Sequence, residues 1–229
     1  MLELRGVRAA YGRIEVLHGV DLEVPEGKVM ALLGPNGGGK TTTIKVASGQ
    51  MQLTAGSVVV AGRRVDGAAP DALARIGMCT IPEGRGIFPN LTVRENLRMA
   101  TFADVQMEAV EERAYEQFPR LGERRTQLAG TLSGGEQQML ALARALAVDP
   151  AVLFLDELSM GLAPIIVDQL YDIVAEIAAS GVSILLVEQF ARVAMRVADL
   201  AAIMLQGRIV RTGDPAELEE ELDRAYLGG

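Results

Sequence analysis

From residue 34 to residue 42 the chain reads GPNGGGKTT, which matches the pattern G-x-x-x-x-G-K-[ST]. The short apolar run Val29–Leu33 precedes this stretch and predicts a buried strand, and Thr41–Ser48 continues as a predicted helix. A strand, a glycine-rich turn and a helix in this order are typical of a phosphate-binding loop, or P-loop. An ordinary glycine-rich turn would need neither flanking element, so the stretch indicates an α/β fold built around a bound phosphate.

Phosphate binding accounts for each residue type in this loop. Glycines let successive backbone N–H groups turn towards the phosphates with no Cβ in the way. The helix that begins near Lys40 points its positive end at the anion. We expect Lys40 to reach the β- and γ-phosphates and the Thr41 hydroxyl to ligate Mg²⁺. The predicted ATP-binding residues of the loop are Gly34, Pro35, Asn36, Gly37, Gly38, Gly39, Lys40, Thr41 and Thr42.

A second buried strand ends in two carboxylates. The apolar run Val152–Leu155 is followed by Asp156 and Glu157. Ligands of open α/β sheets bind at the carboxyl ends of the strands. Two acids alone would suggest a solvated strand end, but beside a P-loop they predict catalysis. We expect Asp156 to hold Mg²⁺, directly or through water, and Glu157 to accept the proton of an attacking water. The pattern therefore predicts ATP hydrolysis with ATP and Mg²⁺ as cofactors.

Strands and helices alternate along the rest of the chain, which predicts a mainly parallel sheet covered on both faces. Residues 91–128 differ, because their pattern is helical and predicts an insert within the strand-rich core. Thr92 and Glu95 fit a capping box there. One helical face of the insert carries Met107, Val110, Ala114 and Phe118. The other predicted helices are 135–147 and Ile165–Ala179. The other predicted strands lie within residues 2–24 and at Ser57–Ala61, Ile76–Ile81, Ser183–Val187, Leu200–Leu205 and Arg208–Arg211.

Composition narrows the class of protein. The 229 residues can bury a sizeable core, and although 49% are hydrophobic, they come in short runs. No run reaches the roughly 18–20 apolar residues of a membrane span, and the N-terminus does not resemble a signal peptide. The single cysteine, Cys79, excludes an internal disulfide, fits a reducing compartment and is interpreted as a buried structural thiol. A net charge of −8 with no basic stripe argues against nucleic-acid binding.

Residues 132–138 read LSGGEQQ. Ser133 and Glu136 fit a capping box that starts a helix, and this arrangement leaves the Ser133 side chain and the Gly135 N–H at a helix N-terminus, where anions bind. The pattern L-S-G-G-[EQ] is the signature of ABC ATPases. Together with the P-loop and the two carboxylates, it makes the whole chain resemble the ATP-binding subunit of an ABC transporter.

The resemblance implies an α/β fold: a P-loop NTPase (RecA-like) core with an N-terminal antiparallel β subdomain and an inserted α-helical subdomain. Residues 1–229 would form a single ABC ATPase domain. Residues 1–82 and 141–229 would make the nucleotide-binding core with its β subdomain. Residues from about 83 to 140 would make the helical subdomain, with the Q-loop and the signature motif.

The resemblance also assigns residues outside the P-loop. Tyr11 stands where the family places an aromatic residue that stacks on adenine, although an edge-strand tyrosine is the alternative. The segment Ser159–Pro164 resembles the D-loop, which touches the dimer partner. Leu158 stands where most relatives have proline, which implies a less stiff loop. The residues expected to bind the ATP held by the partner subunit are Leu132, Ser133, Gly134, Gly135 and Glu136.

Two departures from the family pattern point to a subfamily. Glu83 replaces the Q-loop glutamine near Mg²⁺, and Gln189 replaces the catalytic histidine of the switch loop. His18, the only histidine, lies in a predicted N-terminal strand and is interpreted as a surface or core residue. Residues 82–97, 156–164 and 187–189, which contain PEGR…FP…LTV.ENL, DE.SMGLAP and VEQ, together resemble the second ATPase subunit of high-affinity branched-chain amino acid importers. Urea and amide importers are similar enough to remain an alternative.

The resemblance implies ATP hydrolysis that drives import of a polar solute, with leucine, isoleucine or valine preferred. Expected partners are a second ABC ATPase subunit or a second copy of the chain, two permeases and, indirectly, a substrate-binding protein. Nucleic acid is not an expected partner. The chain would be cytoplasmic and peripheral on the inner face of the cell membrane, which it would contact only through the permeases.

Three other classes of protein are alternatives, and each would show a different sequence. A soluble ABC ATPase acting on DNA or ribosomes would carry a long coiled-coil insertion or two cassettes in one chain. An export or lipopolysaccharide-type ATPase would keep glutamine and histidine at positions 83 and 189. A degenerate module that binds nucleotide without hydrolysing it would lack the intact Lys40, Asp156 and Glu157.

Overall fold

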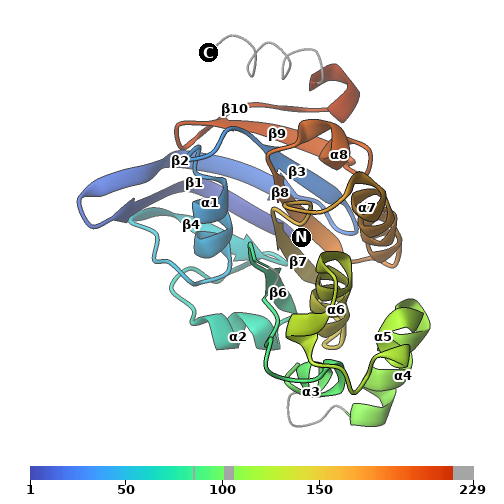
Figure 1. The fold of residues 1–229 in the computed structure, drawn as a ribbon. Helices are drawn as coiled ribbons and strands as arrows, with labels where there is room; N and C mark the ends of the chain where they lie inside the picture. Colours follow the sequence, from blue (N-terminus) through green and yellow to red (C-terminus); the bar gives the residue numbers. More distant parts are fainter. Residues whose placement is uncertain (85, 101–105, 219–229) are drawn as a thin grey trace.

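The computed structural model describes residues 1–84, 86–100 and 106–218, and its centre is a six-stranded sheet with the order β10-β9-β3-β8-β7-β6 (Figure 1). Neighbouring strands of this sheet are parallel, except that β10 runs antiparallel to β9. The prediction of a mainly parallel sheet is confirmed. Its strands are β3 (Val29–Leu33), β6 (Met78–Ile81), β7 (Val152–Asp156), β8 (Ser183–Glu188), β9 (Leu200–Leu205) and β10 (Arg208–Gly213).

A second sheet has four antiparallel strands in the order β2-β1-β4-β5, which confirms the N-terminal antiparallel β subdomain. The helix α1 (Lys40–Ala47) contacts β1 and β2 of this sheet and β7 of the other, so it lies between them (Figure 1). The strands are β1 (Leu2–Tyr11), β2 (Ile14–Val24), β4 (Ala55–Val60) and β5 (Arg63–Arg64).

The six-stranded sheet divides the hydrophobic core in two. Met30 and Leu32 point towards the N-terminal sheet and α1, whereas Val29, Ala31 and Leu33 point towards the helices on the other face. All five are buried. Because both faces are covered, these strands need apolar side chains at every position rather than at alternate ones. This explains the uninterrupted apolar runs before the P-loop and before Asp156.

Helices cover the second face of the sheet. The longest are α6 (Gly134–Leu146) and α7 (Pro164–Ala179), with the short α8 (Ala191–Met195) after β8. The helical insert holds α3 (Val93–Arg98), α4 (Met107–Gln117) and α5 (Pro119–Glu123), which gather at one corner of the molecule (Figure 1). A 3₁₀ turn at Ala129–Thr131 follows, and the predicted boundary between residues 140 and 141 falls inside α6.

Local predictions in the insert agree with the structure. The capping box of Thr92 and Glu95 is present at the start of α3. Val110, Ala114 and Phe118 are buried on one face, with Met107 partly buried beside them. Residues 101–105, which fall within the predicted helical segment, lie outside the described residues, as does Arg85 of the segment after β6.

Two strand predictions were wrong at their ends. The strand expected at Ile76–Ile81 begins only at Met78, because Ile76 is half exposed and Gly77 turns the chain with a φ of +85°. The sequence pattern also missed the preceding helix α2 (Pro70–Arg75), which is a single short element. The strand expected at Ser57–Ala61 runs from Ala55 to Val60, since Ala61 leaves extended conformation with a φ of +47°.

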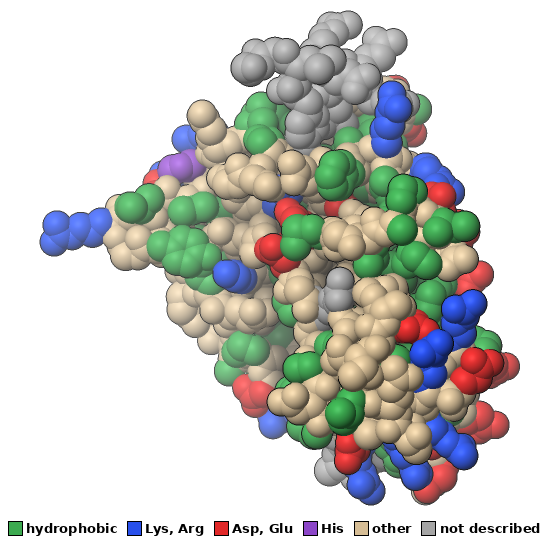
Figure 2. All heavy atoms as spheres, in the orientation of Figure 1, with side chains coloured by type: hydrophobic (Ala, Val, Ile, Leu, Met, Phe, Trp, Pro, Cys, Tyr) green, Lys and Arg blue, Asp and Glu red, His purple; other side chains and the backbone are tan. Residues whose placement is uncertain are grey.

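Among the described residues, none of the helices combines the length and apolar character needed to cross a bilayer. Basic and acidic side chains are interspersed on the face drawn in Figure 2, with no basic stripe along it. Cys79 is partly buried, and burial raises the pKa of its thiol to about 11, which fits the structural role predicted for it.

Candidate active site

A cleft of about 480 Å³ lies where the P-loop meets the carboxyl edge of the six-stranded sheet. The cleft brings the P-loop together with Glu83 and Glu157, which lie far apart in the sequence. Its lining residues are Val16, Asn36, Gly37, Gly39, Lys40, Thr41, Thr42, Glu83, Glu157 and Met160.

Two P-loop glycines are required by packing as well as by the ligand. A Cβ added at Gly34 would lie 2.2 Å from the backbone oxygen of Met204, which is closer than any real contact. Gly39, directly before α1, has a φ of +108°, and its Cβ would lie 3.0 Å from Leu17 Cδ2. The loop therefore has its shape because β9 and β2 press against it from behind.

The turn between β9 and β10 supports the P-loop. The Gly207 N–H donates to the Gly38 oxygen at 2.8 Å, and the Gly207 oxygen accepts from the His18 N–H at 2.9 Å. A Cβ at Gly207 would lie 1.8 Å from the Val16 oxygen. The sequence reasoning missed Gly207, and it placed the half-buried His18 correctly as a residue of an N-terminal strand.

Lys40 forms the floor of the cleft and is only 4% exposed. Its Nζ donates to the backbone oxygens of Gly34 at 2.9 Å and Pro35 at 3.2 Å, and lies 3.9 Å from Glu157 Oε1. Burial lowers the pKa of Lys40, while the charges of nearby carboxylates, Glu157 foremost, oppose that shift. A nucleotide phosphate would offer this ammonium stronger, charged acceptors than the two carbonyls.

Asp156 and Thr41 offer oxygen atoms suited to a divalent cation. The Thr41 hydroxyl donates to Asp156 Oδ1 at 3.2 Å, and Asp156 is 4% exposed. Burial raises the pKa of Asp156 to about 6, opposed by the Thr41 hydrogen bond and assisted by the charges of Glu157 and Glu83. Mg²⁺ is usually bound by one or two carboxylates together with the phosphates of the substrate, and these residues fit that arrangement.

We expect Asp156→Asn to stabilise the metal-free, nucleotide-free protein above about pH 6. The folded-state pKa is raised from 3.8 to about 6, so the folded protein binds the proton more tightly and loses stability as pH rises through this window. Asparagine stays neutral and avoids this loss, so the free energy of unfolding should rise by up to about 3 kcal/mol. Urea unfolding in EDTA should show the gain at about pH 7.5 and a much smaller one at about pH 4.5. If the variant and the wild type differ in free energy of unfolding by the same amount at both pH values, the raised pKa of Asp156 is contradicted.

Glu157 has a strained backbone. Its φ is +52°, in the left-handed region that residues with a side chain rarely occupy, and its N–H donates to the Val187 oxygen at 2.9 Å. Burial raises the pKa of the Glu157 carboxyl, with Lys40 opposing and Glu83 and Glu188 adding to the shift. Strain held in place by a neighbouring strand and a raised pKa are both typical of a positioned base.

Of the remaining predicted site residues outside the signature motif, only Glu83 lines the cleft. Glu83 lies two residues after the end of β6 and is exposed. Gln189 follows β8, is half buried and is not among the lining residues. Tyr11 ends β1, is 50% exposed and does not line the cleft either.

The signature motif lies at the N-terminus of α6, away from the cleft. Its predicted capping box is present, because the Ser133 N–H and hydroxyl donate to Glu136 Oε2 at 2.9 and 2.7 Å, and the Glu136 N–H returns a bond to the Ser133 hydroxyl. A Cβ at Gly135 would lie 2.4 Å from Ile166 Cγ2, so α6 packs closely on α7. Ser133 is exposed, and none of residues 132–136 lines the cleft.

The fold and the cleft together define a P-loop ATPase. The family model described as ABC transporter matches residues 17–159, and the chain belongs to this family. It binds and hydrolyses ATP. It is 43% identical to the high-affinity branched-chain amino acid transport ATP-binding protein BraG of Pseudomonas aeruginosa, with full coverage of both chains.

Other relatives are named for the same solutes or for a different one. The probable branched-chain amino acid transport ATP-binding protein LivF of Archaeoglobus fulgidus is 35% identical over 100% of this chain and 99% of its own. The lipopolysaccharide export system ATP-binding protein LptB of Escherichia coli K12 is 33% identical over 99% and 97%. The ADP conformation of the ATP-binding cassette MJ1267 has the same fold, with a TM-score of 0.88 and 24% identity over 100% of this chain and 99% of its own.

Proposed function

We propose that this chain is the ATPase subunit of an ABC importer of branched-chain amino acids, and that it hydrolyses MgATP at the interface of two cassettes. The proposal of a dimer rests on one observation: the P-loop cleft and the signature motif, which are the two parts of the expected ATP site, do not meet within one chain. The cleft holds Lys40, Glu83 and Glu157, whereas the signature residues lie on a different surface of the same chain. A second cassette would supply the missing half.

In the proposed mechanism the chain acts by positioning and by charge. Lys40 binds the β- and γ-phosphates, and the P-loop N–H groups surround them. Glu157 accepts the proton of the water that attacks the γ-phosphate. Thr41, Asp156 and Glu83 would hold Mg²⁺, which supplies positive charge to the phosphate oxygens when bound.

Across the dimer, the exposed Ser133 and the Gly135 N–H of this chain, at the positive end of α6, face the γ-phosphate held by the other cassette. Tyr11 stacks on adenine, which fits its half-exposed ring. Gln189 orients the water or the phosphate through an amide that is neutral near pH 7, unlike a histidine. This supports an asymmetric dimer in which the other cassette carries the histidine, with a homodimer of this chain as the alternative.

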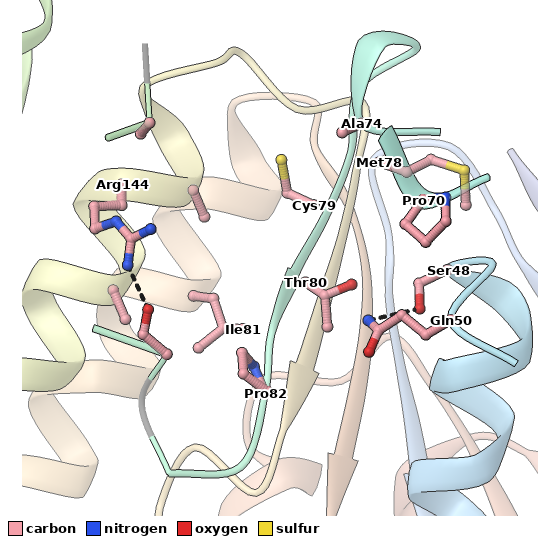
Figure 3. Close-up of a pocket in the computed structure, with 14 residues that line it drawn as sticks. Ser48, Gln50, Pro70, Ala74, Met78, Cys79, Thr80, Ile81, Pro82 and Arg144 are labelled. Atoms are coloured by element: carbon pink, nitrogen blue, oxygen red, sulfur yellow. Dashed lines mark hydrogen bonds between the residues drawn. The ribbon is translucent and has the colours of Figure 1, made fainter. Parts of the chain in front are cut away.

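A groove between the core and the helical subdomain fits the docking of a permease helix. The groove is about 240 Å³ in volume, and Figure 3 shows Arg144 of α6 on one side of it, opposite Gln50 and Pro70. The Arg144 guanidinium donates to the Gly86 oxygen and lies 4.7 Å from the centre of the Phe88 ring. The buried Asn96 fixes Phe88 further, by accepting from its N–H at 2.8 Å and donating to its oxygen at 2.9 Å.

Gly86, which lines the groove, lies three residues after Glu83, which lines the ATP cleft. The half-exposed Phe88 and Met99 offer apolar surface nearby. Movement of a docked permease helix would therefore shift Glu83 in the cleft. Closure of the cassette dimer would in turn move the docked helix of the permease. The chain would thus meet the membrane only through its permeases, at the cytoplasmic face.

The identity of the solute is tested by transport. Expressed with two permeases and a binding protein of the branched-chain amino acid importer family, in cells lacking branched-chain amino acid import, the wild-type chain should restore uptake of labelled leucine. The Glu157→Gln chain should not restore it. Uptake of urea or a short amide in place of leucine would contradict the proposed solute. ATP-dependent release instead of uptake would contradict the proposed direction of transport.

A further inference from the structure

Glu188, the last residue of β8, is a carboxylate buried in the core at 1% exposure. It accepts three hydrogen bonds: from the Ser159 N–H at 3.0 Å, from the Ser159 hydroxyl at 2.9 Å and from the Tyr171 hydroxyl at 2.5 Å. All three donors are neutral, and Tyr171 is fully buried. We refer to Glu188, Ser159 and Tyr171 as the Glu188 network.

A carboxylate at this position is costly unless its oxygens are hydrogen-bonded, since burial removes its hydration. The other five side chains of β8 include four aliphatic ones, so an apolar residue would suit the end of the strand for packing alone. Burial and the charge of Glu188 raise the pKa of the Tyr171 phenol, which therefore remains a donor. The network must serve some purpose other than the packing of the core.

Its location points to the loop that follows Glu157. Ser159 lies two residues after Glu157, and Glu188 lies one residue before Gln189. The Glu157 N–H is already bonded to the Val187 oxygen at 2.9 Å, so Glu188 ties the same loop to β8 at a second point. The two strand ends that carry the predicted base and the predicted switch residue are thereby joined.

The loop is also held from the signature helix. Gln138 of α6 is 3% exposed and donates to the Leu158 oxygen at 3.0 Å. Tyr171 comes from α7, against which α6 packs. The loop at residues 158–159 is thus bonded to β8 by Glu188 and to α6 by Gln138, while Tyr171 holds Glu188 from α7.

We propose that Glu188 is a positioning residue for ATP hydrolysis: its carboxylate fixes the loop at Leu158–Ser159 relative to β8, and so aims Glu157 and Gln189 at the γ-phosphate. The inference rests on the proposed role of Glu157 as base. Glu188 lines no part of the cleft, so it does not touch the substrate and acts on Glu157 through the loop and through its own nearby charge.

The test is Glu188→Gln. An amide keeps the shape but has no charge, and its NH₂ can only donate, so the Ser159 hydroxyl must reverse from donor to acceptor and the remaining bonds lose their charge assistance. We expect the kcat for ATP to fall by about 10-fold or more, because small misplacements of reacting groups are expensive. The KM for ATP should stay within about 2-fold, since the P-loop contacts are untouched. Ser159→Ala should lower kcat less, and adding it to Glu188→Gln should lower kcat little further.

Val174→Ala is the matched control. Val174 lies on α7 near Tyr171, is fully buried and carries no polar atom, so the variant loses packing and stability but leaves the network intact. Its kcat below the unfolding temperature should equal that of the wild type. If Glu188→Gln folds and keeps the wild-type kcat, or changes only KM, the proposal is wrong.

Should Glu188→Gln fail to fold, Tyr171→Phe and Ser159→Ala decide instead. Each removes a hydroxyl donor, and wild-type kcat in both would overturn the proposal. Failure of the underlying function is distinguishable, because it would appear as near-normal turnover in Glu157→Gln, whatever Glu188→Gln does.

Discussion

Replacing Glu157 with glutamine should lower ATP turnover by about 10²-fold or more while ATP binding persists, since positioned bases typically contribute that much. Glutamine has the same size and leaves the strained backbone of residue 157 unchanged, so only the basic carboxylate is lost. Because ATP then stays bound, the variant should accumulate as an ATP-bound dimer. Single-turnover hydrolysis and size-exclusion chromatography with ATP measure the two effects.

Glu176→Gln provides the control for this experiment. Glu176 is an exposed glutamate on α7, and its replacement should change neither turnover nor dimerisation. Near-normal hydrolysis in Glu157→Gln would remove Glu157 from the role of base and would transfer that role to another group of the cleft, with Glu83 the first to examine.

Lys40→Ala should weaken ATP binding by about 10²-fold or more, because it removes charged hydrogen bonds to two phosphates. The substitution should also lower the stability of the fold, since Lys40 Nζ donates to the Gly34 and Pro35 oxygens at the floor of the cleft. The cost should be modest, because burial also disfavours the charged lysine and lowers its pKa. Calorimetric titration with ATP and thermal unfolding without it separate the two effects.

Lys45→Ala is the matched control, a lysine of the same helix in its last turn. It should bind ATP as the wild type does. Unchanged ATP affinity in Lys40→Ala would mean that the glycine-rich loop does not bind the phosphates in the manner proposed.

Some elements followed from local pattern. The strand, loop and helix around Lys40 were predictable because phosphate binding requires glycines, a lysine and a hydroxyl at fixed spacing. The capping boxes at Thr92 and Ser133 were predictable because their partners lie three residues away on the same turn. The ends of the strands were less predictable. For example, β6 starts after Gly77, whose positive φ was not evident from the apolar run.

The sequence alone determined the class of this protein: a P-loop, two carboxylates after a buried strand and a signature helix define an ABC ATPase, since each motif is set by chemistry within a few neighbouring residues. Tertiary structure decided which distant residues support these motifs. Gly207 braces Gly38 and Glu188 holds Ser159 across long separations in the chain. It also decided that Ser133 lies away from the cleft of its own chain. Such contacts depend on how the sheets and helices pack, and no local pattern of residue types encodes that packing.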